Sequence, residues 1–195
     1  MVRYDAATAL IVVDVQNDFA DPAGSLYVRG GETLIPFINR EIARAAAAGA
    51  AVIYSRDWHP PTTPHFAKDG GIWPVHCVAG AWGAEFHPAL DRVGDREIRK
   101  GTGGEDGYSA FTVRDPASGN VAATALAAML AGLGSARLVV VGLATDYCVK
   151  ETALDARRLG FAVTVLRDGI RAVDLQPGDG ERALAAMQGA GAVLE

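Results

Sequence analysis

Several kinds of residue are scarce in this sequence. Two of its 195 residues are cysteine, which is too few for a disulfide scaffold. Lysine and arginine number 18 against 23 acidic residues, which gives a formal net charge of −5, and the basic residues form no run. Because no basic field attracts nucleic acid or an anionic membrane surface, we expect neither as a partner.

Long apolar runs are also missing. No stretch approaches the roughly 18 residues that a membrane span needs, and the longest candidate, Ala45–Tyr54, is alanine-rich and interrupted by Gly49. The N-terminus does not resemble a signal peptide, because Asp5 and Asp14 flank its short apolar run, Ala9–Val13. We therefore predict a cytoplasmic protein.

Apolar residues are nevertheless abundant. They make up 50% of the chain and charged residues 21%, which is enough for one well-buried core. No linker, repeat or low-complexity segment divides the sequence. We therefore predict a single domain over residues 1–195.

Apolar segments typical of buried strands alternate with helical patterns along the chain. The expected strands are Ala9–Val15, Ala51–Ser55, Glu97–Lys100, Arg137–Leu143, Phe161–Leu166 and Gly191–Leu194. The expected helices are Glu32–Ala48, Asn120–Leu133, Tyr147–Leu159 and Asp179–Gln188. Apolar strands separated by helices indicate an α/β fold with a parallel sheet covered on both faces.

Reactive side chains follow the ends of several of these strands. Asp14 comes at the end of the first strand, and Asp57 and His59 follow the second. Lys100 ends the third strand, and Cys148 follows the fourth. In open parallel sheets, ligands bind beyond the carboxyl ends of the strands. We therefore expect these side chains to share one site.

Histidine and aspartate cluster beside the second strand. Three of the four histidines, at positions 59, 65 and 76, follow Asp57 closely. Asp57 and His59 point the same way in an extended segment, and His65 and His76 come from the loop after it. Imidazole and carboxylate ligands without thiolate suit one divalent transition metal, namely zinc, iron or manganese. The alternative is a set of surface histidines in a loop, but their concentration at a strand end favours a metal site.

Cys148 is the candidate nucleophile. A thiol at a helix N-terminus has its pKa lowered by unpaired N–H groups, which can also receive an oxyanion. Since the histidines are better used by a metal, Asp14 is the candidate base, and Lys100 would offset the cost of burying it. Taken singly, each has a structural alternative: a small buried residue, a loop cap and a surface lysine. Their placement at neighbouring strand ends favours catalysis, whereas Cys77, in mid-loop, is expected to be structural.

Other nucleotide and hydrolase motifs are absent. The run Gly101–Gly107 lacks G-x-G-x-x-G spacing and no clear helix follows it. The sequence contains neither a P-loop nor a G-x-S-x-G elbow. A Rossmann-type cofactor binder is therefore disfavoured.

Together these motifs resemble the nicotinamidase/pyrazinamidase branch of the isochorismatase-like cysteine hydrolases, along essentially the whole chain. The matching segments are Ala9–Phe19, Arg56–Pro60, Pro64–Phe66, Trp73–Cys77, Phe86–Pro88, Arg99–Gly101 and Gly142–Cys148. Asp14 and the loop ending at Cys148 mark the wider superfamily, and Asp-x-His followed by two histidines marks the branch. The resemblance implies a three-layer α/β/α fold with a six-stranded parallel sheet.

The resemblance also implies an activity, the deamidation of nicotinamide and of pyrazinamide to the acid and ammonia through a cysteine thioester, with a role in NAD salvage. Asp14 would deprotonate Cys148 and pass the proton to the leaving ammonia. Lys100 would hold Asp14 and help to depress the thiol pKa. The backbone N–H groups of Ala144 and Cys148 would form the oxyanion hole, with a cis peptide between Leu143 and Ala144.

A metal site made of Asp57, His59 and His76 is implied as well, in which the metal binds the pyridine nitrogen of the substrate. His65 is a further ligand whose use varies in the family. The positions expected to wall the substrate ring are Phe19, Trp73 and Tyr108. The chain departs from several relatives at Tyr147, where they place histidine, and because that side chain is outside the triad we expect little consequence.

Two other functions stay open on the sequence alone. One is another amidase of the superfamily, acting on a different small amide or an N-carbamoyl compound, although a metal-free relative has no need of the Asp-His-His set. The other is a catalytically silent, metal-stabilised interaction module, which the intact triad argues against. A small-molecule substrate is the expected partner, and the oligomeric state is open, a homo-oligomer included.

Overall fold

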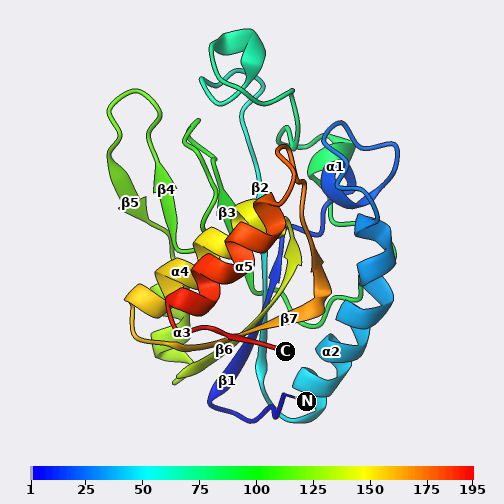
Figure 1. The fold of residues 1–195 in the computed structure, drawn as a ribbon, viewed down its shortest axis with the longest axis vertical. Coiled ribbons are helices and arrows are strands. Elements are labelled where there is room, and N and C mark those ends of the chain that lie inside the picture. The colour runs from blue at the N-terminus through cyan, green and yellow to red at the C-terminus, as the bar shows by residue number, and fades with distance from the viewer. Residues whose placement is uncertain (1) are drawn as a thin grey trace.

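The centre of the fold is a parallel sheet, in a computed structural model that describes residues 2–195 (Figure 1). The sheet has six strands in the order β3-β2-β1-β6-β7-β8. They are β1 (Thr8–Val13), β2 (Ala51–Asp57), β3 (Glu97–Lys100), β6 (Arg137–Leu143), β7 (Ala162–Arg171) and β8 (Val193–Leu194). Neighbouring strands pair in parallel throughout the sheet, which confirms the predicted fold class. The strand order reverses between β1 and β6, the place where such sheets bind ligands.

Helices cover both faces of the sheet and complete three layers (Figure 1). On one face lies α2 (Ile35–Ala47), and on the other lie α3 (Leu126–Gly132), α4 (Lys150–Arg158) and α5 (Asp179–Gly189). The short α1 (Asn17–Ala20) follows β1. No helix among residues 2–195 is long and apolar enough to cross a bilayer.

Strand β1 shows why the predicted strands are apolar throughout. Leu10 and Val12 pack in the core that α2 covers, whereas Ala9, Ile11 and Val13 pack in the core on the opposite face. Successive side chains of a strand point to opposite faces. Because both faces are covered, no position of the strand is left for a solvated side chain.

One predicted helix, Asn120–Leu133, is wrong in its first half. Val121–Ala123 forms β5, which pairs antiparallel with β4 (Thr112–Arg114) in a ribbon that projects from the body of the protein (Figure 1). All three residues of β5 are exposed. Their periodicity therefore carried no information about packing, and backbone pairing with β4 decided their conformation. The helix α3 begins only at Leu126.

The expected helix Tyr147–Leu159 also begins differently. Residues Thr145–Val149 form a π-helical turn, and α4 follows it from Lys150. π-helical turns are frequent at functional sites. This one carries Cys148.

Candidate active site

Asp14 lies directly after β1, with its carboxylate fully buried at the carboxyl edge of the sheet. Its φ of 50° is left-handed, which is unusual for a residue other than glycine and is typical of functional sites. The Ser55 hydroxyl donates to Asp14 Oδ1 at 2.7 Å, and Lys100 Nζ donates to Oδ2 at 2.6 Å. Both carboxylate oxygens are therefore held by donors from other strands of the sheet, one from β2 and one from β3.

Lys100, the last residue of β3, is fully buried between two carboxylates. Besides Asp14, its Nζ lies 2.9 Å from Asp57 Oδ1 and donates to the carbonyl of Gly107. A buried ammonium is tolerated only when it is paired and hydrogen-bonded. Lys100 therefore links the Asp14 side of the site to the Asp57 side.

Cys148 completes this group of residues. Its sulfur and one carboxylate oxygen each of Asp14 and Asp57 lie within 4.8 Å of one another. The peptide bond between Leu143 and Ala144, just before the π-helical turn, is cis, as the resemblance implies. The structure thus brings together the three residues predicted from separate strand ends, Asp14, Lys100 and Cys148.

The pKa of the Cys148 thiol differs from the sequence expectation. Burial raises this pKa well above its usual range, and Lys100 only partly opposes the burial and the nearby carboxylates. Burial also raises the pKa of Asp14, against the opposing effect of Lys100. Burial therefore favours the neutral form of both the Cys148 thiol and the adjacent Asp14 carboxyl group, an arrangement suited to proton transfer from sulfur to oxygen.

Asp57 faces the histidines with its other oxygen. Its Oδ2 lies 3.7 Å from His59 Nε2 and 4.0 Å from His76 Nε2. Burial by itself raises the pKa of Asp57, but Lys100 and the two imidazoles outweigh it and hold the pKa well below the usual range. Burial lowers the pKa of His76 to about 4 and also lowers that of His65. A charged carboxylate and neutral imidazoles are the forms that ligate a divalent metal.

Two short backbone pairings bring the histidines together. His59 donates its N–H to the carbonyl of Cys77 at 3.0 Å, in a parallel bridge that places it beside the segment of His76. Phe66 forms a second parallel bridge with Trp73, which folds the segment of His65 over the same place. One ring nitrogen from each of the three histidines therefore comes within 4.8 Å of the other two.

The surroundings of His59 test whether a metal fits. The ring is fully buried, and neither nitrogen has a hydrogen-bond partner among residues 2–195. Buried polar groups are nearly always partnered, so the ring fits the role of a metal ligand, in which an ion would satisfy one of its two nitrogens. Gly101, at a φ of 71°, allows the ring to sit where a Cβ would collide with it. One carboxylate and three imidazoles without thiolate fit zinc, iron or manganese.

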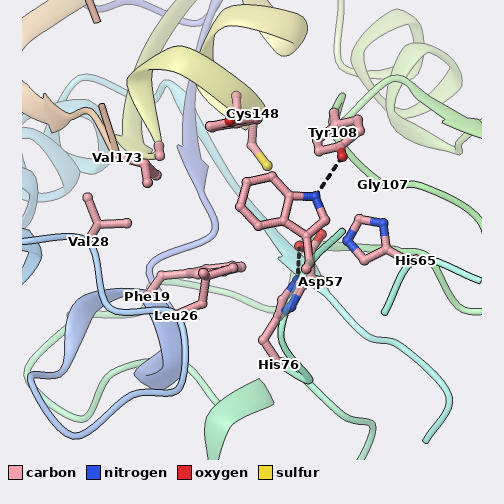
Figure 2. Close-up of a pocket in the computed structure, with 13 residues that line it drawn as sticks. Phe19, Leu26, Val28, Asp57, His65, His76, Gly107, Tyr108, Cys148 and Val173 are labelled. Carbon is pink, nitrogen blue, oxygen red and sulfur yellow. Dashed lines mark hydrogen bonds and ion pairs between the residues drawn. The ribbon is translucent and has the colours of Figure 1, made fainter. Parts of the chain in front are cut away.

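A pocket opens between Cys148 and the histidines (Figure 2). The Cys148 sulfur points into it, and His76 lies on the opposite side. Its largely apolar walls include Phe19, Leu26, Val28, Trp73, Tyr108, Tyr147 and Val173. The indole N–H of Trp73 donates to the Tyr108 hydroxyl at 2.8 Å, which ties two wall segments together. The pocket therefore has largely apolar, aromatic walls, with the Cys148 sulfur on one side and the histidines on the other.

Tyr147, the position at which the sequence departs from several relatives, belongs to this wall. Its ring packs edge-on against the indole of Trp73, with the ring centroids 4.9 Å apart. The wall therefore contains three aromatic side chains in mutual contact, since Trp73 also bonds to Tyr108.

Several residues of the site escaped the sequence analysis. Gln16 holds the backbone of Asp57 from both sides, because its Oε1 accepts the Asp57 N–H and its Nε2 donates to the Asp57 carbonyl, each at 2.8 Å. Asp106 contacts His65 Nδ1 at 2.6 Å. Of the three, only Ser55 could have been predicted from the sequence, because a polar side chain in an apolar, buried strand is costly unless it has a hydrogen-bond partner. The other two lie in polar loops, where such residues are ordinary.

The sequence of this chain is similar to those of known proteins. A model of the isochorismatase domain matches residues 8–195. The chain is 39% identical to a nicotinamidase of Escherichia coli (strain K12), over 95% of this chain and 93% of that protein. It is 40% identical to a nicotinamidase/pyrazinamidase of Mycobacterium tuberculosis, over 82% of this chain and 84% of that protein.

Two solved structures are also similar to this chain in fold and sequence. The pyrazinamidase of Pyrococcus horikoshii in complex with zinc superposes with a TM-score of 0.86 at 41% identity, covering 97% of this chain and 98% of that chain. PnC1 from L. infantum in complex with nicotinate superposes with a TM-score of 0.88 at 38% identity, covering 100% of this chain and 95% of that chain.

Proposed function

The chain belongs to the isochorismatase family, and from this premise we infer that it is an amidohydrolase that deamidates nicotinamide to nicotinate and ammonia. One observation carries the inference. Cys148, Asp14 and Lys100 lie together on one side of an aromatic pocket, and the histidines with Asp57 lie on the other. Pyrazinamide, a ring of the same shape with a carboxamide, is proposed as a second substrate.

In the first half of the reaction, the Cys148 thiol gives its proton to the Asp14 carboxylate as the sulfur attacks the carboxamide carbon. A C–S bond forms and the carbonyl oxygen becomes an oxyanion, which the backbone N–H groups of Ala144 and Cys148 receive. When the oxyanion collapses, the C–N bond breaks and Asp14 returns the proton to the leaving nitrogen. Ammonia departs and a thioester to Cys148 remains.

In the second half, water attacks the thioester carbon and gives a proton to Asp14. The C–S bond then breaks, the proton on Asp14 passes to the Cys148 sulfur, and the nicotinic acid that forms loses its own proton to solvent and leaves as nicotinate. Lys100 stays charged throughout, because Asp14 and Asp57 raise its pKa well above the usual range despite its burial. Its fixed charge stabilises Asp14 whenever that carboxylate is ionised.

Asp57, His59, His65 and His76 are the residues that would hold one divalent metal ion. When bound, the ion would supply a Lewis-acidic contact to the pyridine nitrogen and so orient the carboxamide toward Cys148. The zinc complex of the Pyrococcus horikoshii relative supports a divalent metal. Zinc, iron and manganese are the ions that we propose for this donor set.

Metal removal tests this function. Purified protein should release ammonia from nicotinamide, and a chelator wash should lower the rate by at least about tenfold, equivalent to about 1.4 kcal/mol of lost transition-state stabilisation. Added zinc, iron or manganese should restore the rate. The measurement is an ammonia assay before the wash, after it and after metal addition, with circular dichroism to show that the fold persists.

The opposite result is equally informative. If metal-loaded protein with a free Cys148, shown in a separate sample to react with a thiol reagent, released no ammonia from nicotinamide, the proposed substrate would be wrong. A panel of small amides and N-carbamoyl compounds would then be assayed.

The rate should also depend on pH through Asp14. The base must be ionised to accept the thiol proton. We therefore expect kcat/KM to be high above the pKa of Asp14 and to decrease as pH falls through that pKa. Because burial raises that pKa, the acid limb should lie above the value of about 3.9 that is usual for a free aspartate. The measurement is a pH–rate profile in which bound metal is quantified at each pH. An acid limb at or below pH 4 with metal retained would contradict the assignment.

Three further assignments complete the proposal. Residues 1–195 act as one domain, and the two cysteines, both free, suit a reducing compartment such as the cytoplasm. We place the activity in NAD salvage, since nicotinate is its product. A homo-oligomer stays open, and light scattering of the purified protein measures it.

A further inference from the structure

Asp106 contacts the metal site from outside the set of predicted ligands. It lies in the loop between β3 and β4, and its Oδ1 is 2.6 Å from His65 Nδ1. The His65 side chain is 4% exposed and that of Asp106 is 20% exposed. In this arrangement the Nδ1–H of His65 donates to the carboxylate, a charge-assisted hydrogen bond in a mostly dry environment.

The backbone of Asp106 is held on both sides. Its N–H donates to the carbonyl of Arg114 at 2.7 Å, and the N–H of Arg114 donates back to the carbonyl of Asp106 at 2.9 Å. The next residue, Gly107, accepts a hydrogen bond from buried Lys100. The carboxylate is therefore presented from a braced position between the end of β4 and the buried lysine.

This contact selects the tautomer of His65. With hydrogen on Nδ1, the lone pair is on Nε2, the nitrogen left free to bind a metal. The His65 ring stacks on that of His59, with centroids 4.7 Å apart. His76 follows the same pattern, because its Nδ1 is 2.7 Å from the carbonyl of Pro74 while its Nε2 faces Asp57. Metal-binding histidines typically donate their second N–H to such a partner.

We propose that Asp106 is a positioning residue of the metal site, which holds His65 in the orientation and tautomer that make its Nε2 a fourth protein ligand. This inference deepens the proposed function and rests on it only in taking Asp57, His59 and His76 to hold a divalent ion. Asp106 acts through His65 and contacts neither the metal nor the substrate.

The test is zinc affinity, measured by competition with a chromophoric chelator on metal-free protein. Asp106→Ala should weaken zinc binding by about 10- to 100-fold. Asp106→Asn should lie between the alanine variant and the unaltered protein, because the carboxamide oxygen still accepts the Nδ1–H. Glu105→Gln is the matched control, since it removes a charge from the same loop at a side chain that accepts the N–H of Gly103 and not that of His65. The control should keep full affinity.

A double-mutant cycle separates positioning from simple charge attraction. In a His65→Ala background, Asp106→Ala should cause no further loss of zinc affinity. An equal loss in both backgrounds would overturn the proposal, because Asp106 would then act by its charge alone. Unchanged zinc affinity in both Asp106 variants would overturn it as well. Thermal unfolding of the metal-free variants checks that each is folded. If Asp106→Ala is not folded, the zinc affinity of Asp106→Asn tests the proposal.

The activity of the unaltered protein is measured in the same preparations. If that protein binds zinc, Asp106→Ala weakens the binding and no ammonia appears from nicotinamide, the proposed substrate fails and the positioning role stands. If ammonia appears but the Asp106 variants bind zinc normally, only the positioning role fails.

Discussion

Replacing Cys148 with alanine should lower the rate of ammonia release from nicotinamide by at least about 10⁴-fold. Loss of a nucleophile removes the covalent route entirely, and what remains is catalysis by binding and the oxyanion hole. The substitution removes one sulfur atom from a nearly buried position, so the fold should persist. Steady-state kinetics with nicotinamide, on protein shown by circular dichroism to be folded, measures the effect.

Cys77 provides the matched control for this variant. It is buried too, but it lies outside the pocket, with its sulfur 3.8 Å from the carbonyl of Gly83. Cys77→Ala should keep the rate within a few-fold of the unaltered protein and lose only some stability. A Cys148→Ala variant with a rate within tenfold of the unaltered protein would show that the thioester route is wrong.

Removing the charge of Lys100 should have the largest effect on stability. Lys100→Met keeps most of the side-chain length but leaves Asp14 and Asp57 buried without their shared cation. Breaking one partner out of a buried ionic group costs about 3–5 kcal/mol. Urea unfolding at pH 7 measures this loss, and activity should fall with it because Asp14 no longer has a fixed partner.

The pH dependence distinguishes this cause from poor packing. Without Lys100, the buried carboxylates have pKa values raised above those of the unfolded chain, so their ionisation destabilises the fold as pH rises. The stability deficit of Lys100→Met should therefore shrink as pH is lowered from 7 toward 5. A deficit that does not change with pH would point to packing alone. Lys68→Ala is a surface control that removes an ion pair with the neighbouring Asp69, and it should cost less than about 0.5 kcal/mol.

Much of the fold was predictable because a strand that is buried on both faces of a sheet has a continuous run of apolar residues. The strands Glu97–Lys100 and Arg137–Leu143 have the same bounds in the structure, and three others differ from their predicted bounds by one or two residues at one or both ends. The exception is β7, which continues five residues past its predicted end at Leu166. The prediction of a helix over Val121–Ala123 was wrong for a related reason, namely the absence of burial. These exposed residues contact no core, so their pattern records nothing that a sequence argument can use.

The candidate site divides in the same way. Asp14, Lys100 and Cys148 were recognisable because polar or reactive side chains at the ends of apolar strands are costly unless they share a site. The hydrogen bond from His65 to Asp106 has no such mark, since both residues lie in irregular segments 41 positions apart. The direction of the Cys148 pKa was also beyond the sequence, because it depends on how completely two carboxylates and a lysine are buried around the sulfur.

The sequence by itself therefore determined the six strands of the central sheet, the layers that cover it and the residue types near the strand ends, because those depend on local periodicity and the need to bury apolar surface. Only the tertiary structure decided how His59, His65 and His76 meet, which atoms brace them, and which groups hold protons. Those properties arise from backbone bridges and buried charge pairs between segments far apart in the chain. Their energies depend on distances that no spacing along a sequence records.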